Sequence, residues 1–226
     1  MTDAPLSHPT AGTGPRSRLV GALLAIGLVA TACSPSSATA IAADGLERRA
    51  DGWHALPVEA KRTLPDVTLE DVDGDEVSLA DDLNGTPTLL FFGYSSCPDI
   101  CPIHLSAIAS AMDTAGVSFD ELDVVFVSVD PERDDPERIE EFLANFDERM
   151  IGLHGDLDTV EAALAQLDLP GPVVEGSDPR GEGELIAHPA QVIGFDAEGE
   201  ARRSWPFGAR RSDWVSDLPR VVEEWS

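Results

Sequence analysis

Cysteine is scarce in this chain of 226 residues, which contains only Cys33, Cys97 and Cys101. Three cysteines exclude a scaffold held together by many disulfides and a zinc site built from four thiolates. Basic residues are scarce as well: 15 Lys and Arg residues, among them the single lysine Lys61, face 42 acidic residues. The formal net charge of −27 argues against DNA or RNA as a partner, because nucleic acid would be repelled.

The acidic residues are spread along the chain rather than gathered in a tail. Dense surface carboxylates become tolerable when concentrated salt screens their mutual repulsion, so we expect a halophilic protein. Hydrophobic residues make up 42% of the chain, which is enough for a packed core. The length favours one domain with an appendage over two full domains.

The N-terminal apolar run at residues 19–32 has only 14 residues, whereas a membrane-spanning helix needs about 20. Arg16 and Arg18 precede this run and small residues end it, which is typical of a secretory signal. Cys33 follows directly, an arrangement that resembles a lipoprotein cleavage box, in which the cysteine becomes the lipid-bearing first residue. Ordinary cleavage and an uncleaved anchor are the alternatives. All three place the protein outside the cytoplasm, at the outer face of the membrane if it is anchored.

The following residues are rich in Ser, Ala, Asp and Arg and show no apolar period, which is typical of a tether. We therefore predict a signal sequence at residues 1–32, a lipid-anchored or flexible tether at 33–54, and a folded domain at 55–226.

The apolar pattern of that domain predicts an α/β fold. The expected elements are a hairpin over residues 67–79, buried strands at 88–92 and 124–127, helices at 101–116, from 135 and around 160–167, a short strand at 151–154, a loop at 170–183, strands at 192–195 and 201–205, and a helix from 212 that Pro219 kinks. A strand, a helix and a strand in this order form a right-handed parallel unit. The whole order predicts a thioredoxin-like sandwich with an N-terminal β-hairpin extension.

Cys97 and Cys101 lie between a buried strand and the start of a helix. The helix dipole and its unpaired N–H groups favour thiolate over thiol at this place. A spacing of four residues brings both sulfurs to one side of the first turn, where they can form a disulfide or share one soft metal ion. A purely structural disulfide is disfavoured, because so short a loop gains little stability from closure.

A mononuclear metal site needs a third ligand, and the histidines are the candidates: His8, His54, His104, His154 and His188. A local cluster that includes His104 is geometrically feasible, but an exposed helix histidine is favoured there. His54 and His154 have no motif around them, and His8 lies upstream of the apolar run of the signal. His188 comes before a central strand, whose entry lies beside the cysteine loop in a thioredoxin-like sheet. Position alone leaves ligand and ordinary histidine open for His188.

Three segments together resemble the Sco/SenC family. Residues 93–102, Gly-Tyr-Ser-Ser-Cys-Pro-Asp-Ile-Cys-Pro, resemble its metal-binding loop, and residues 128–137, Ser-Val-Asp-Pro-Glu-Arg-Asp-Asp-Pro-Glu, resemble its second signature. His188, ahead of a strand that ends in residues 196–199, is similar to the third. The resemblance covers about residues 60–226.

This resemblance implies a membrane-tethered domain that binds Cu(I) or Cu(II) through Cys97, Cys101 and His188. Family members assist assembly of the CuA centre in cytochrome c oxidase, as copper donors, as reductants of the target cysteines, or as both. Asp99 lies between the cysteines and either orients a ligand or partner or starts the helix. Asp130 and Arg133 follow a parallel strand at the same sheet edge; we expect them to cap and brace loops more readily than to shape the site.

The first hypothesis is therefore an exported copper metallochaperone that serves the oxidase subunit with the CuA site, or another copper enzyme. The second is an enzyme, a thiol–disulfide oxidoreductase in which Cys97 and Cys101 form the redox pair. A peroxide-reducing enzyme is disfavoured, because the single peroxidatic cysteine with nearby Thr and Arg is not evident.

Overall fold

The computed structural model describes residues 45–181 and 183–226. The predicted signal at 1–32, the predicted lipid site Cys33 and most of the predicted tether lie outside these residues. Within the described ranges, every helix is too short or too polar to cross a membrane.

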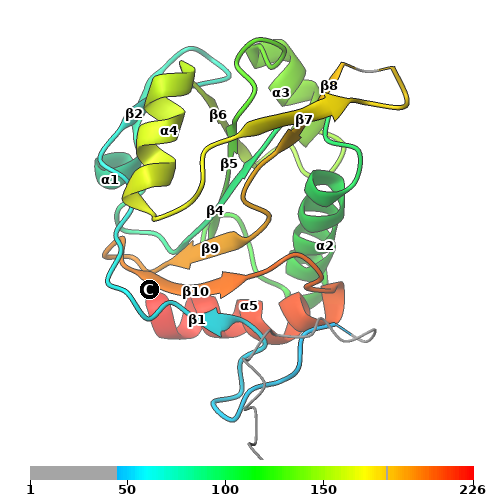
Figure 1. The fold of residues 1–226 in the computed structure, drawn as a ribbon. Helices are drawn as coiled ribbons and strands as arrows, with labels where there is room; N and C mark the ends of the chain where they lie inside the picture. Colours follow the sequence, from blue (N-terminus) through cyan, green and yellow to red (C-terminus); the bar gives the residue numbers. More distant parts are fainter. Residues whose placement is uncertain (1–44, 182) are drawn as a thin grey trace, which may run out of the picture. The chain divides into compact units, whose positions relative to one another are not determined.

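A mixed eight-stranded sheet forms the centre of the described domain (Figure 1). Its strands, in spatial order, are β1 (Leu56–Pro57), β10 (Ala201–Trp205), β9 (Val192–Phe195), β4 (Thr88–Gly93), β5 (Asp123–Ser128), β6 (Ile151–His154), β2 (Thr68–Asp71) and β3 (Glu76–Ser78). Strands β4, β5 and β6 are parallel, and the other neighbours pair antiparallel. All six residues of β4 are buried, as expected for a central strand.

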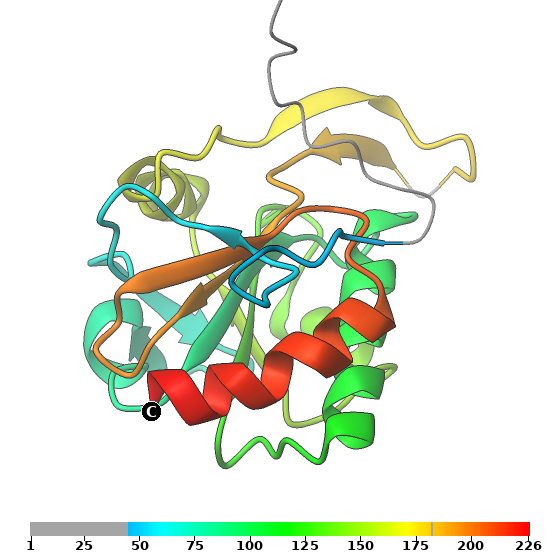
Figure 2. The same ribbon diagram turned by 90° about the horizontal axis from the view of Figure 1, so that it is seen from below.

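Helices cover both faces of this sheet. They are α1 (Leu79–Asp82), α2 (Ile100–Ala115), α3 (Pro136–Leu143), α4 (Leu157–Gln166) and α5 (Arg211–Trp225). Right-handed crossovers place α2 and α3 on the same face, because β4, β5 and β6 are successive both in the chain and in the sheet. Helix α5 packs against α2 on that face, and Figure 2 shows α4 on the opposite one. The predicted thioredoxin-like sandwich is confirmed.

Helix α2 follows the predicted apolar stripe. Its buried side chains include Cys101, Leu105, Ile108 and Met112, which recur at helical spacing. Gly116 ends the helix in the left-handed conformation, with φ 71°, which a glycine adopts without steric cost. The stripe turns the first turn of α2, and Cys101 with it, toward the sheet.

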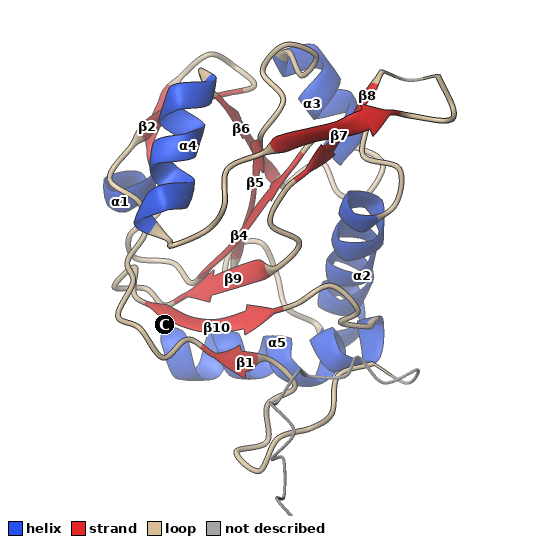
Figure 3. Ribbon diagram, viewed as in Figure 1, coloured by secondary structure: helices blue, strands red, loops and turns tan. Residues whose placement is uncertain are grey.

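Residues 170–183 are not the uninterrupted loop that their Gly, Pro and acidic composition predicts. Val173–Ser177 (β7) and Glu184–Ala187 (β8) form a separate antiparallel hairpin, which projects beside the main sheet (Figure 3). The β-branched pair Val173 and Val174 and the apolar residues of β8 favour strands. Residues 170–172 and the turn between the strands retain the predicted loop character.

The packed domain begins before the predicted boundary at residue 55. Leu46 and Trp53 are buried. Asp213 of α5 accepts a hydrogen bond from the backbone N–H of Leu46, at 2.8 Å, and Asp217 accepts one from Ala55. Helix α5 runs from Arg211 to Trp225 and contains Pro219, the proline predicted to kink it, within its length. The short N-terminal segment is therefore part of the fold, held on α5 by two buried carboxylates.

Candidate metal centre

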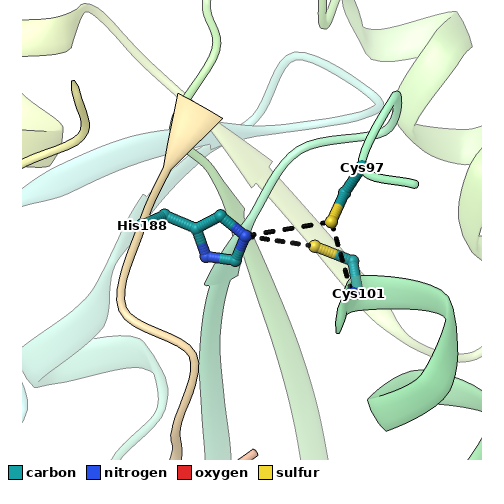
Figure 4. Close-up of side chains that lie close together, drawn as sticks. All are labelled: Cys97, Cys101 and His188. Atoms are coloured by element: carbon teal, nitrogen blue, oxygen red, sulfur yellow. Dashed lines mark hydrogen bonds between the residues drawn. The ribbon is translucent and has the colours of Figure 1, made fainter. Parts of the chain in front are cut away.

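Three elements of the fold supply the site. Cys97 lies in the loop after β4, Cys101 is the second residue of α2, and His188 directly follows β8. Figure 4 shows the imidazole of His188 pointing at both sulfurs. The structure thus brings together the three residues that the sequence singled out as ligands.

The distances between the donor atoms are short. The Nε2 atom of His188 lies 3.6 Å from Sγ of Cys101 and 3.9 Å from Sγ of Cys97. The three donor atoms lie within 4.8 Å of one another. Among the described residues, this is the one group of three or more such side chains close enough to share a metal ion. Two sulfurs and one imidazole suit a soft ion such as Cu(I).

A glycine makes room for the buried sulfur. A Cβ atom at Gly93, the last residue of β4, would lie 2.7 Å from Sγ of Cys101 and 2.8 Å from the ring of Phe126. Both contacts are far below van der Waals distance, so a side chain here would displace the sulfur. Gly93 therefore lets α2 start directly against the central strand.

The two cysteines differ in acidity. A hydrogen bond from the Cys101 side chain, with smaller contributions from His188 and backbone N–H groups, lowers the pKa of Cys97 to about 4. The backbone N–H of Cys101 lies 3.5 Å from Sγ of Cys97, as expected at a helix start. Burial, and next the neighbouring Cys97, raise the pKa of Cys101 well above its ordinary value. At neutral pH the metal-free pair is therefore one thiolate and one thiol.

The ring of His188 is oriented for metal binding. Its Nδ1 atom lies 3.1 Å from the carbonyl oxygen of Pro189. Because a carbonyl only accepts, Nδ1 donates this hydrogen bond, and Nε2 is the ring nitrogen that faces both sulfurs. The rings of Tyr94 and Phe91 pack edge-on to the imidazole, with centroids 5.6 and 6.0 Å away.

Hydrogen bonds in both directions between the body of the domain and the β7–β8 hairpin hold this hairpin near the cysteines. Arg133 donates to the carbonyl of Glu184 at 2.9 Å and lies over the Tyr94 ring. Arg180 donates to the carbonyl of Ser96, one residue before Cys97, at 3.1 Å. The sequence assigned no role of its own to Arg180 or Tyr94, because the distant groups that they contact, at Ser96 and Ile186, are backbone groups.

The supporting acidic residues act mainly on loops. Asp99 is the N-cap of α2, and its carboxylate accepts a hydrogen bond from the backbone N–H of Ile100 at 2.6 Å. Asp130 forms an ion pair with Arg133, which itself reaches the hairpin. Asp99 thus lies at the start of α2, and Asp130 and Arg133 link the loop after β5 to the hairpin.

His104 is buried, not exposed as the sequence suggested. It is 0% exposed, and its Nε2 atom lies 3.0 Å from the carbonyl oxygen of Ala190. Burial lowers the pKa of His104 to about 4, so the ring is neutral at pH 7. The signal was present, because His104 falls on the buried stripe that runs from Cys101 to Ile108.

The remaining described histidines lie outside the cluster. Nδ1 of His54 lies 3.1 Å from Asp217, in the contact between the N-terminal segment and α5. His154 is in β6, and its Nε2 atom is buried without a hydrogen-bond partner among the described residues. Neither joins the donor group around the cysteines.

Known proteins of similar sequence and similar fold exist for this chain. The SCO1/SenC family model matches residues 57–223, well over half of the chain. The chain is 29% identical over 142 residues to the protein sco1 of Schizosaccharomyces pombe; this match covers 62% of the chain but only about half, 52%, of that relative.

Two solved structures with bound copper are similar to this one. One is ScoI of Bradyrhizobium japonicum, 28% identical with a TM-score of 0.60, and the match covers 71% of this chain and 99% of that one. The other is yeast Sco1, 26% identical with a TM-score of 0.64, where the match covers 73% of this chain and 90% of that one.

Proposed function

This chain belongs to the SCO1/SenC family, and we propose that it is an exported copper metallochaperone that assists assembly of the CuA centre of cytochrome c oxidase. The observation that carries the proposal is the grouping of Cys97, Cys101 and His188, whose donor atoms lie within 4.8 Å of one another. The copper in the two similar Sco structures supports copper as the ion.

The chain's own residues fit the capture and release of a copper ion. Cys97 offers a ready thiolate and is the less buried cysteine, at 7% exposed against 0% for Cys101. Cys101 releases its proton when the metal binds, because the thiolate is the ligand. His188 contributes a neutral nitrogen. Three ligands leave Cu(I) open to an incoming thiolate, so the acceptor can take the ion by stepwise ligand exchange from the Cys97 side.

Copper binding by the reduced protein and by a His188→Ala variant tests this proposal. We expect one Cu(I) per chain in anaerobic, high-salt buffer. Mutating a residue that only supports a metal ligand typically lowers metal affinity roughly 10–100-fold. His188→Ala should lower the Cu(I) affinity by more than this, because His188 is itself a ligand. His54→Ala is the matched control, since His54 lies outside the donor group.

A competition titration with a coloured Cu(I) chelator measures both affinities. If His188→Ala binds copper as tightly as the wild type while the control behaves normally, the proposed site is wrong. If the wild type itself binds only weakly, the cysteines act in redox chemistry instead.

The alternative function is a thiol–disulfide oxidoreductase that reduces the copper-ligand cysteines of the oxidase subunit. The low pKa of Cys97 and its closeness to Cys101 favour it. The Cys97 thiolate attacks the acceptor disulfide, forms a mixed disulfide with one acceptor sulfur and releases the other as a thiolate. Cys101, after losing its proton, then attacks the sulfur of Cys97 in this mixed disulfide and releases the second acceptor thiolate. Two electrons pass to the acceptor, and Cys97 and Cys101 end as a disulfide.

Reduction of an oxidised CuA-site peptide by the copper-free protein separates the two functions. A reductase remains active when His188 is replaced by alanine, because His188 only tunes or positions a thiolate and the exchange itself needs only the two sulfurs. A metallochaperone without reductase activity leaves the peptide oxidised.

We further propose export through the segment 1–32 and anchoring through lipid on Cys33, which places the copper site at the outer face of the cytoplasmic membrane. The acceptor is the oxidase subunit with the CuA site or another exported copper enzyme. Mass spectrometry of the mature N-terminus tests the anchor: a diacylglycerol-modified Cys33 is expected, and an unmodified N-terminus or an intact segment 1–32 contradicts it.

A further inference from the structure

Two hydrogen bonds bracket His188 symmetrically. Two residues before it, the backbone N–H of Ile186 donates to the hydroxyl of Tyr94 at 3.3 Å. Two residues after it, the carbonyl of Ala190 accepts a hydrogen bond from Nε2 of His104 at 3.0 Å. The backbone that carries the imidazole is therefore fastened on both sides.

The two side chains that fasten it also bracket the dithiol segment. Tyr94 lies three residues before Cys97, and His104 lies three residues after Cys101. Each hydrogen bond thus joins one flank of the cysteine segment to one flank of His188. This arrangement fixes the position of the imidazole relative to the sulfurs, although the two parts lie about ninety residues apart in the chain.

Ring contacts strengthen the same links. The Tyr94 ring packs against His188 at 5.6 Å, and the Phe91 ring of β4 touches both His104 and His188, at 5.4 and 6.0 Å. Tyr94 and His104 are 2% and 0% exposed. A buried hydrogen bond holds its partners firmly, because water cannot replace it when it breaks.

We propose that Tyr94 and His104 are positioning residues that hold the imidazole of His188 within reach of both thiolates and so preorganise the copper site. This inference rests on the copper-binding function proposed above and adds to it the residues that set the geometry. A preorganised site loses less binding free energy to ordering its ligands, so the affinity and the coordination signature depend on both residues.

Four variants of the full chain test the inference. Tyr94→Phe removes only the hydroxyl, and His104→Leu removes the donor at similar volume. His104→Gln restores an N–H donor at a comparable reach. His54→Leu is the matched control, because it removes a histidine hydrogen bond to Asp217 away from the site. The readouts are Cu(I) affinity by chelator competition, the electron paramagnetic resonance spectrum of the Cu(II) form, and ring-to-ring nuclear Overhauser contacts between residues 94 and 188 without metal.

Tyr94→Phe and His104→Leu should each lower the copper affinity about tenfold. This is the lower end of the loss seen when a residue that supports a metal ligand is mutated. Both should alter the Cu(II) spectrum and weaken the contacts in the metal-free protein. His104→Gln should stay close to wild type, and His54→Leu should bind copper normally even if it unfolds more readily.

Wild-type affinity, spectrum and metal-free contacts in both Tyr94→Phe and His104→Leu would overturn the inference and leave the copper proposal intact. A wild-type protein that fails to bind copper refutes the proposed function instead. The metal-free contacts still decide whether Tyr94 and His104 hold His188 in place.

Discussion

At the scale of single residues, the two cysteines of the site differ in burial and in pKa. Cys97 is 7% exposed and has its pKa lowered to about 4, whereas Cys101 lies fully buried against β4 and has its pKa raised. One sulfur is therefore charged before any metal arrives, and the other is held neutral in the interior. Such a pair can meet a metal ion or an acceptor with Cys97 first.

Alkylation of the metal-free, reduced protein by iodoacetamide should report this difference. The rate at Cys97 should rise through a midpoint near pH 4 and stay level to pH 7, because the thiolate is the reactive form. Cys101 should resist modification. In Cys101→Ala the midpoint for Cys97 should move up, because the largest contribution to its low pKa is lost.

Peptide mapping by mass spectrometry over a series of pH values measures each cysteine separately. An ordinary thiol titration near pH 8–9 at Cys97 would contradict the assignment.

At the scale of elements, the start of α2 depends on Asp99. Its carboxylate caps the helix at Ile100. Asp99→Ala should lower the free energy of unfolding by about 0.5–2 kcal/mol, the usual loss for an N-cap, and Asp99→Ser should restore most of it. Urea denaturation of the metal-free protein measures both values.

Copper affinity shows whether Asp99 does more than cap. We expect Asp99→Ser to bind copper as the wild type does. A large loss of affinity in this well-folded variant would instead assign Asp99 to orienting a ligand or a partner.

The elements that the sequence predicted well are those with a strong local pattern. Strand β4 is a continuous apolar run, and α2 shows a clear helical stripe that ends at Gly116. The β7–β8 hairpin was missed, because strands of five and four residues on either side of a Gly- and acid-rich turn are too short for their pattern to distinguish strand from loop. Its stability comes from contacts such as Arg133 with Glu184, which no local pattern encodes.

The site shows the same limit. Cys97 and Cys101 are close in sequence, so their spacing alone predicted a shared site. His188 needed the fold, because only the sheet brings it to the cysteine loop. Tyr94 and His104 were not predicted to hold it, because their partners are backbone groups of the distant segment around His188, whose positions follow from the packed structure alone.

At the scale of the whole molecule, negative charge dominates. The chain has 42 acidic residues against 15 basic ones. In the described part, ion pairs such as Arg62 with Asp168 and Arg220 with Glu224 are exposed and weakly stabilising. Repulsion among the many remaining carboxylates opposes the compact state unless salt screens it.

Thermal stability should therefore rise with salt. Between about 0.05 M and 2 M KCl the Debye length falls from more than 10 Å to less than 3 Å, which removes most of the repulsion between surface carboxylates. We expect a gain on the order of 2 kcal/mol in the free energy of unfolding, or roughly 4–8 °C in Tm for a domain of this size.

Circular dichroism melts across the KCl series measure this gain, with sucrose as the control that strengthens burial without screening charge. The rise should be steeper in KCl than in sucrose of equal osmolality. Equal Tm in dilute buffer and in molar KCl would mean that the carboxylates are spaced widely enough not to repel, and the halophilic interpretation of the composition would be wrong.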